Sequence, residues 1–210
     1  MRDENARVGP VRAVGVDLMD TLVHDPWSEA VLRVTGMRPE ASRALRDREA
    51  WADFELDRIG EDEYERRFFL PESGRRLDLA ALKREFRASY RFLPGMEQLM
   101  LEVSRRLPVH ILSNYPRWYE DVRDMFVLDR FVSGHHPSYV LGARKPAREY
   151  FERALARIGL PPHEVLSIDD REANVAAARA LGMPAVLFTD AADLRRRLAA
   201  LTPPLVGPPG

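Results

Sequence analysis

The sequence predicts an α/β fold, a doubly wound parallel sheet with an α-helical segment inserted after the first strand. Three observations predict it. A short β-branched run at 11–16 ends at a carboxylate, Asp17. The segment 24–90 carries apolar residues at helical spacing and contains no strand candidate. From residue 96 onward, helical segments alternate with short apolar runs, which is typical of a parallel sheet with helices on both faces.

The change of pattern within 24–90 predicts the domain organisation. Pro26 and Pro39 each begin a helix-like stretch, and glycine and proline residues interrupt the rest of the segment. We expect three parts: residues 1–23 with 91–201 form the α/β core, residues 24–90 form an α-helical cap, and residues 202–210 form a Pro/Gly-rich, disordered tail.

The strands of the core locate the candidate site. The run 11–16 is expected to be a buried strand. Four further strands are expected at 109–112, 130–133, 165–168 and 185–188. They follow helices expected at 96–106, from about Pro116, at 147–158 and at 172–181. Ligands of such sheets bind beyond the carboxyl ends of the strands. The residues at these ends are Asp17, Ser113–Asn114, Ser133–Gly134 and Asp169–Asp170.

Composition predicts an ordinary soluble globular protein. Hydrophobic residues make up 45% and charged residues 31% of the 210 residues. The net charge of −1 provides no basic field for nucleic acid. The absence of cysteine excludes disulfides and thiolate catalysis. Neither a signal peptide nor an apolar run of about 18 residues is present, so we expect a cytoplasmic protein without a membrane or nucleic-acid partner. Nothing in the sequence specifies an oligomeric state.

Each strand-end motif has an ordinary structural interpretation when taken alone. Residues 17–22 suit a strand-to-turn junction. Ser113–Asn114 suits a helix N-terminus, which is also the geometry of an anion site. A single lysine in a loop, such as Lys145, is usually solvated. Asp169–Asp170 is different, because adjacent carboxylates in a buried crevice are costly unless a cation compensates them. Mg²⁺, a hard ion that prefers oxygen ligands, is the natural candidate.

The order of these motifs resembles that of the haloacid dehalogenase-like (HAD) hydrolase superfamily. The resemblance extends from Val11 to about Phe188 and is strongest at 92–95, 142–146 and 168–174. It implies a Rossmann-like core and places the helical insertion as the family's cap of the first type. The last motif is similar to the branch that contains the phosphatase domain of soluble epoxide hydrolase and small sugar-phosphate phosphatases.

The resemblance implies a hydrolase that acts on a small phosphorylated metabolite. By position, Asp17 would be the nucleophile and would form an aspartyl-phosphate, which divides one difficult step into two. Ser113 and the backbone N–H of Asn114 would bind the phosphoryl oxygens, and Lys145 would offset their charge. Thr21 would bind phosphate or brace the turn.

The resemblance also implies a Mg²⁺ cofactor. Its ligands would be Asp17, Asp170 and the backbone carbonyl of Met19. Asp169 would lie behind these ligands, near Lys145, and would orient them.

Met19 departs from the family pattern. The family's phosphatases usually carry a second aspartate two residues after the nucleophile, which protonates the leaving group and then activates water. Asp20 stands where the family often has glycine. A thioether cannot carry a proton, and losing a positioned acid/base typically costs ~10²–10⁴ in rate. The proposed metal site would not suffer, since it needs only the carbonyl of Met19.

Three interpretations of Met19 remain open. The first is a phosphatase with slow turnover or with a good leaving group, in which Asp20 replaces the missing acid through a shifted turn. Adjacent side chains of an extended segment point in opposite directions, which argues against Asp20. The second is a weak or inactive phosphate-binding or regulatory protein. The third is a dehalogenase, although those lack the Asp169–Asp170 pair, or a phosphonatase, for which Lys83 is the one cap lysine.

Overall fold

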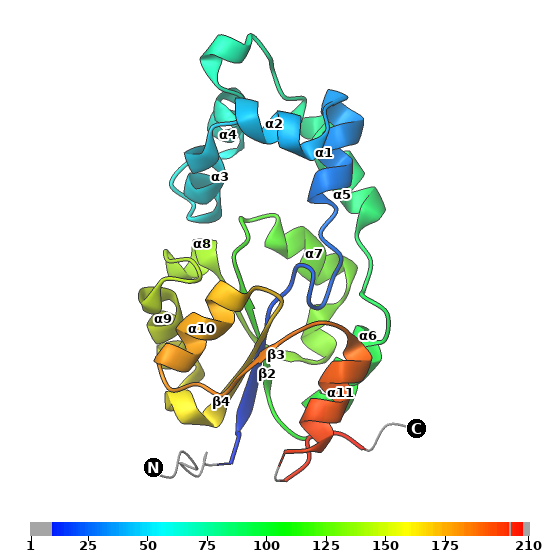
Figure 1. Ribbon diagram of the computed structural model, residues 1–210, viewed down its shortest axis with the longest axis vertical. Coiled ribbons are helices and arrows are strands. Elements are labelled where there is room, and N and C mark those ends of the chain that lie inside the picture. Colours follow the sequence, from blue (N-terminus) through cyan, green and yellow to red (C-terminus); the bar gives the residue numbers. More distant parts are fainter. Residues whose placement is uncertain (1–9, 202, 208–210) are drawn as a thin grey trace.

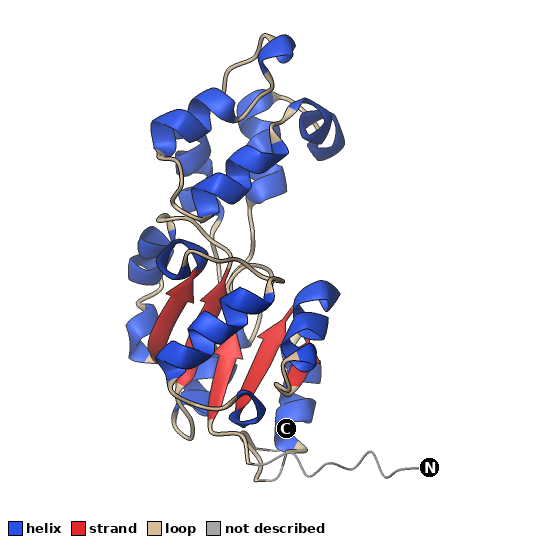
Figure 2. Cartoon of the chain, turned by 90° about the vertical axis from the view of Figure 1, so that its left-hand side faces the viewer, coloured by secondary structure: helices blue, strands red, loops and turns tan. Residues whose placement is uncertain are grey.

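The computed structural model describes residues 10–201 and 203–207. Its centre is a sheet of five parallel strands in the order β3-β2-β1-β4-β5, with helices on both sides (Figure 2). The strands are β1 (Ala13–Val16), β2 (Val109–Ser113), β3 (Val132–Pro137), β4 (Val165–Asp169) and β5 (Ala185–Leu187). The expected doubly wound α/β fold is therefore confirmed.

Eleven α-helices are found among the described residues. The first five are α1 (Trp27–Thr35), α2 (Pro39–Leu45), α3 (Arg48–Glu55), α4 (Glu61–Arg67) and α5 (Leu79–Ser89). The others are α6 (Met96–Ser104), α7 (Tyr119–Met125), α8 (Ser138–Leu141), α9 (Arg148–Ile158), α10 (Glu172–Ala180) and α11 (Ala191–Ala199). Figure 1 shows α1–α5 as a separate group beyond the carboxyl ends of the strands. We call this group the cap, and the limits 24–90 remain our proposal for its boundaries.

The alternation of side chains along the strands builds two apolar layers. Ala13 of β1 packs in a cluster with Phe151 of α9 and Ala178 of α10. Val14 and Val16, which point to the other face, pack in the larger cluster that contains α6, α7 and α11. Burial on both faces explains why β1, β2 and β4 are largely apolar.

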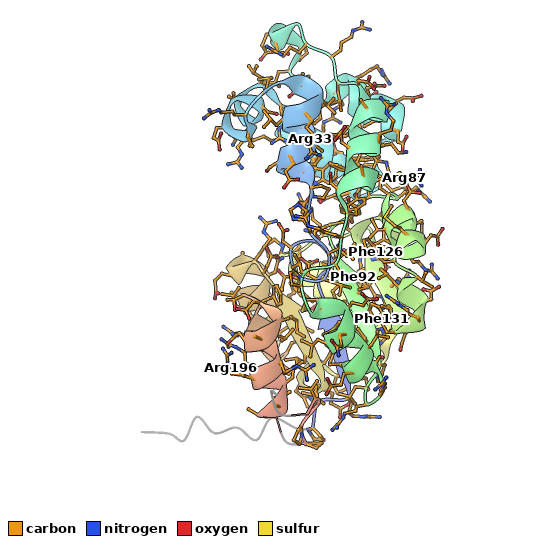
Figure 3. The ribbon with its side chains drawn as sticks, turned by 90° about the vertical axis from the view of Figure 1, so that its right-hand side faces the viewer. Arg33, Arg87, Phe92, Phe126, Phe131 and Arg196 are labelled. Carbon is orange, nitrogen blue, oxygen red and sulfur yellow. The ribbon has the colours of Figure 1, made fainter. Side chains whose placement is uncertain are left out.

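The segment that follows α5 is held to the core by aromatic contacts, and the cap is held to it by a charged contact. After α5 the chain returns through Phe92, whose ring lies 4.5 Å from that of Phe126 and 6.4 Å from that of Phe131 (Figure 3). Arg87 of α5 pairs with Asp121 of α7 at 3.1 Å. The cap is thus fixed over the carboxyl edge of the sheet.

Strand β3 differs from the expectation. It was expected at 130–133 but spans Val132–Pro137, so Ser133–Gly134 lies within the strand and not at its carboxyl end. Gly134 is needed there for packing, because a Cβ at this position would lie 2.5 Å from Nδ1 of His110. A Ser-Gly pair is typical of a turn, and the sequence does not reveal this close approach.

The C-terminal tail also differs from the expected disorder. Leu205 and Val206 are buried in the large apolar cluster. The N–H of Gly207 donates to a carboxylate oxygen of Glu102 at 2.7 Å. Two apolar residues among prolines are enough to anchor this segment. The remaining tail residues, 202 and 208–210, lie outside the described residues. Among the helices of the described chain, none combines the length and apolarity of a membrane span.

Gly15 generates a prediction about stability. A Cβ at this position in β1 would lie 2.4 Å from Cδ1 and 2.9 Å from Cγ of Leu112 in the neighbouring strand. We expect Gly15→Ala to lower the free energy of unfolding by about 1–3 kcal/mol, because overpacking shifts β1 against β2. Urea denaturation measures the change. In the control Gly60→Ala, the added Cβ meets no atom within 4 Å, and we expect a loss below about 1 kcal/mol. Equal losses in the two variants would contradict the packing argument.

Candidate active site

The central position of β1 brings three strand ends together. The N–H of Asp17 donates to the carbonyl of Ile168 in β4 at 2.9 Å. Val16 lies opposite Ile111 of β2 on one side and opposite Ile168 on the other. Because all of these strands are parallel, the residues at their carboxyl ends, Asp17, Ser113 and Asp169, meet at one edge.

Lys145 connects these strand ends. Its Nζ lies 2.9 Å from Oδ1 of Asp17 and 2.6 Å from Oδ2 of Asp169, and it donates to the carbonyl of Leu112 at 2.6 Å. The side chain is almost fully buried. Burial lowers the pKa of Lys145, but the two carboxylates outweigh burial and raise it above the ordinary value. Lys145 is therefore a charged group with an acceptor for each of its three protons.

Asn114 positions the loop that carries Lys145. Its side-chain Nδ2 donates to the carbonyl of Lys145 and its Oδ1 accepts from the N–H of Lys145, each at 2.8 Å. The sequence predicted a role for the backbone N–H of Asn114. The paired hydrogen bonds of the side chain were not anticipated, because they join residues that are 31 positions apart.

The carboxylates form a cluster suited to a cation. Single oxygens of Asp17, Asp169 and Asp170 all lie within 4.8 Å of one another. Asp169 also accepts from the N–H of Arg171 at 3.0 Å and from Nδ2 of Asn174 at 2.8 Å. With Lys145 added, these bonds occupy both oxygens of Asp169. Asp17 and Asp170 are therefore the better candidates for direct metal ligands, with Asp169 behind them.

The electrostatics of this cluster favour an additional positive charge. Burial raises the pKa of Asp17 to about 7, although Lys145 opposes the shift. Burial and the neighbouring Asp169 raise the pKa of Asp170. One ammonium group faces three carboxylates, so the cluster carries more negative charge than Lys145 balances.

Two buried hydroxyls near this edge have no partner. Oγ of Ser113 and Oγ1 of Thr21 are buried and form no hydrogen bond with any described residue. An unsatisfied buried hydroxyl costs about 1–3 kcal/mol. Ser113 lines the cavity that contains Asp17, whereas Thr21 does not. The Ser113 hydroxyl is therefore free to bind a ligand in that cavity.

Met19 and Asp20 lie at the rim of the same cavity. No hydrogen bond to the carbonyl of Met19 is found among the described residues, so this oxygen is available to a metal. Asp20 has a left-handed backbone, with φ of 54°. Its side chain is 53% exposed, and its Oδ1 accepts from the N–H of Asp25 at 3.0 Å.

Two adjoining cavities surround these groups. The first, the catalytic cavity, has a volume of about 340 Å³ and is lined by Asp17, Met19, Asp20, Asp25, Trp51, Glu55, Ser113, Asn114, Tyr115, Arg144, Lys145, Asp170, Arg171 and Asn174. The second, the cap cavity, has about 460 Å³ and is lined by Asp25, Trp27, Arg43, Arg46, Asp47, Arg48, Trp51, Tyr64, Phe68, Phe86, Tyr115 and Arg171. Four residues, Asp25, Trp51, Tyr115 and Arg171, line both cavities.

Sequence reasoning left open which cap residues line the catalytic cavity. Asp25, Trp51 and Glu55 line it, and the last two belong to α3. Apolar spacing in the sequence placed Trp51 on a helix, but it does not reveal which side of that helix faces the core. Glu55 follows the apolar Phe54 and carried no signal of its own.

Lys145 generates a prediction about stability. We expect Lys145→Met to lower the free energy of unfolding by about 3–5 kcal/mol, because two buried carboxylates lose their partner. Lys83→Met is the matched control. Lys83, the other lysine of the chain, pairs with Glu61 on the surface, and its loss is expected to cost about 1 kcal/mol or less. Chemical denaturation in metal-free buffer measures both. A loss at Lys145 no larger than that at Lys83 would contradict the assigned charges.

Comparison with known proteins agrees with this geometry. The haloacid dehalogenase-like hydrolase family matches residues 11–182 of this chain. Flavin mononucleotide hydrolase 1 of Arabidopsis thaliana, named as a chloroplast protein, is 32% identical over 200 residues, which cover 95% of this chain and 81% of that protein. Sesquiterpene phosphatase AstK of Aspergillus oryzae is 30% identical over 148 residues, covering 68% of this chain and 74% of that protein.

Solved structures share the fold. A HAD family enzyme from Bacteroides thetaiotaomicron, in complex with magnesium and inorganic phosphate, superposes with a TM-score of 0.70. It is 17% identical, and the match covers 86% of this chain and 96% of that one. The family match, the relatives and the convergence of Asp17, Lys145 and Asp169–Asp170 at one sheet edge lead to one conclusion. This chain belongs to the haloacid dehalogenase-like hydrolase family.

Proposed function

We propose that the chain is a Mg²⁺-dependent phosphatase that transfers a phosphoryl group to Asp17 and then to water. The observation that carries this proposal is the unpartnered Ser113 hydroxyl, which faces the same cavity as Asp17 and Lys145. A hydroxyl, the backbone N–H of Asn114 and an ammonium group suit the oxygens of a phosphoryl group. The phosphatase names of two relatives point in the same direction.

The residues present fit a magnesium ion. Asp17, Asp170 and the carbonyl of Met19 would hold it, and Asp169 would support them from behind. Magnesium, when bound, would neutralise the charge that develops on the phosphoryl oxygens. The excess of carboxylates over Lys145 supports this assignment. It also disfavours a metal-free dehalogenase, whose site would leave that charge uncompensated.

Asp17 would act as the nucleophile. Its carboxylate oxygen forms a bond to phosphorus while the bond from phosphorus to the ester oxygen breaks. Lys145, held by Asp169, orients the Asp17 carboxylate and offsets charge on the phosphoryl group. Water then displaces phosphate from Asp17. A weak phosphate-binding protein is the second candidate, because Met19 removes the usual proton carrier.

The cap cavity supports a substrate with a large aromatic or apolar body. Its wall includes five aromatic side chains from the cap, and the guanidinium of Arg46 lies 5.1 Å from the Trp27 ring centre. Rings and guanidinium planes stack on flat aromatic ligands. Arg43, Arg46 and Arg48 add positive charge for a second polar or anionic group. Flavin mononucleotide and sesquiterpenyl phosphates, named for the two relatives, are candidates of this kind.

The cytoplasmic location expected from the sequence remains a proposal, and so does the absence of a nucleic-acid partner. The Arabidopsis relative is named as a chloroplast protein. A small phosphorylated molecule is the partner that the cavities support.

The first test concerns chemistry. We expect phosphate release from 4-nitrophenyl phosphate or acetyl phosphate that EDTA abolishes and Mg²⁺ restores. Asp17→Asn is expected to lower kcat/KM by about 10⁴-fold or more, because it removes the nucleophile. Colorimetric phosphate assays measure both effects. Phosphate release that is independent of Mg²⁺ and of Asp17 would rule out the proposal, and chloride release from 2-haloacids without metal would favour the dehalogenase alternative.

The second test concerns substrate choice. We expect kcat/KM for flavin mononucleotide or farnesyl phosphate to exceed that for glycerol 3-phosphate by about tenfold or more, because stacking on an aromatic wall contributes about 1–3 kcal/mol. Trp51→Leu should reduce this ratio. Phe131→Leu, in the core beside Phe92 and outside both cavities, should leave the ratio unchanged. A ratio near one in the unmodified protein would contradict the role of the cap cavity.

A further inference from the structure

The catalytic cavity lacks a proton carrier at Met19, but other carboxyl groups face it. Besides Asp17 and Asp170, the described side chains that line the cavity include three carboxyl groups, those of Asp20, Asp25 and Glu55. An alkyl leaving group needs a proton as its bond to phosphorus breaks, and the attacking water must lose one. One of these three groups is the natural candidate for both transfers.

Asp20 and Asp25 are less well placed for proton transfer. The side chain of Asp20 is more than half exposed, and its Oδ1 accepts from the N–H of Asp25. Asp25 uses its Oδ1 to accept from the N–H of Trp27 at 2.9 Å, at the start of α1. A carboxylate at a helix N-terminus is stabilised in its charged form. Burial nevertheless raises the pKa of Asp25 to about 6, so an Asp25 variant is included in the experiment below.

Glu55 is held over the catalytic cavity by contacts with the core. It is the last residue of α3 and is 3% exposed. Its backbone carbonyl accepts from Oγ of Ser138 at 2.7 Å. Its Oε2 lies 2.8 Å from the Arg144 guanidinium but forms no well-directed hydrogen bond with any described residue. Glu55 lines the catalytic cavity, so its carboxyl group, paired with Arg144, lies where a proton can pass to or from a bound molecule.

The charges around Glu55 support this role. Burial raises the pKa of the Glu55 carboxyl group to about 7, against the lowering effect of Arg144, Arg171 and Lys145. A general acid/base works best when its pKa lies near the operating pH. Both protonation states of Glu55 are then accessible under neutral conditions.

We propose that Glu55, supplied by the cap, is the general acid and base that Met19 cannot be. The proposal rests on the phosphoryl transfer to Asp17 proposed above. In the first half-reaction, Asp17 bonds to phosphorus, the ester P–O bond breaks, and Glu55 gives its proton to the leaving oxygen. In the second, water attacks phosphorus and loses a proton to Glu55, while the bond from phosphorus to Asp17 breaks and phosphate departs.

A control variant at Asp57 distinguishes proton transfer by Glu55 from a purely structural role. Glu55 also ties the cap to the core, as does Asp57, whose carboxylate lies 2.6 Å from Nη2 of Arg117. Asp57 lies two residues after the end of α3 and does not line the catalytic cavity. Asp57→Asn therefore weakens the contact between cap and core without altering proton transfer, whereas Glu55→Gln removes the proton carrier with almost no change in shape.

The experiment compares leaving groups in rapid-mixing kinetics with Mg²⁺ present. The proteins are wild type, Glu55→Gln, Asp57→Asn and Asp25→Asn, and the substrates are 4-nitrophenyl phosphate and glycerol 3-phosphate. Nitrophenolate departs without a proton, so Glu55→Gln should release about one equivalent of nitrophenolate in a fast burst. Its steady-state turnover should then be slower than that of the wild type by about 10²-fold or more. On glycerol 3-phosphate the same variant should lose about 10²–10⁴-fold in kcat and show no burst.

Each other outcome overturns the proposal. An equal loss on both substrates without a burst, shared by Asp57→Asn, would mean that Glu55 only holds the cap in place. A burst in Asp25→Asn but not in Glu55→Gln would assign the role to Asp25. Wild-type turnover that Glu55→Gln leaves unchanged would reject this inference alone. The absence of Mg²⁺-dependent turnover in the wild type would reject it together with the proposed function.

Discussion

The buried contact of Lys145 with Asp17 and Asp169 is the constraint on which the rest of the site depends. A buried ammonium group is tolerated only where acceptors surround it, and here they come from the ends of β1, β2 and β4. These ends meet because β1 lies at the centre of the sheet and all strands are parallel. The Asn114 side chain then fixes the loop that carries Lys145 by hydrogen bonds to the backbone N–H and carbonyl of Lys145. Sheet topology and site chemistry are thus a single arrangement.

That contact leaves a charge imbalance that a substrate and a cation would correct together. The cluster holds three carboxylates and one lysine, and the Ser113 hydroxyl is buried without a partner among the described residues. A divalent cation would balance the carboxylates, and an anionic phosphoryl group would pair with Lys145 and the Ser113 hydroxyl. The cap completes the enclosure from above. It adds the aromatic wall and places the buried Glu55 at the catalytic cavity, where burial strengthens electrostatic interactions.

Much of this arrangement could be predicted from the sequence, because it depends on local patterns. Alternating helices and apolar runs predicted the parallel sheet, and that sheet placed Asp17, Ser113 and Asp169 at one edge. Residues whose roles depend on packing between distant segments could not be predicted. Gly134 lies within β3 because it packs closely against His110. Leu205 is held by the large apolar cluster. The position of Glu55 depends on the contact between the end of α3 and Ser138. Helical spacing predicts a helical cap, but it does not predict which cap residues enter the cavity.

The central claim is that Asp17 becomes covalently phosphorylated, and direct detection of that intermediate tests it best. Protein mixed with Mg²⁺ and acetyl phosphate, quenched in acid and digested, can be analysed by peptide mass spectrometry after borohydride reduction of acyl phosphates. We predict phosphorylation, and after reduction homoserine, at Asp17 in the peptide that contains Val16 and Met19, with none in Asp17→Asn. Modification at another residue, or turnover without any acyl phosphate at Asp17, would contradict the account.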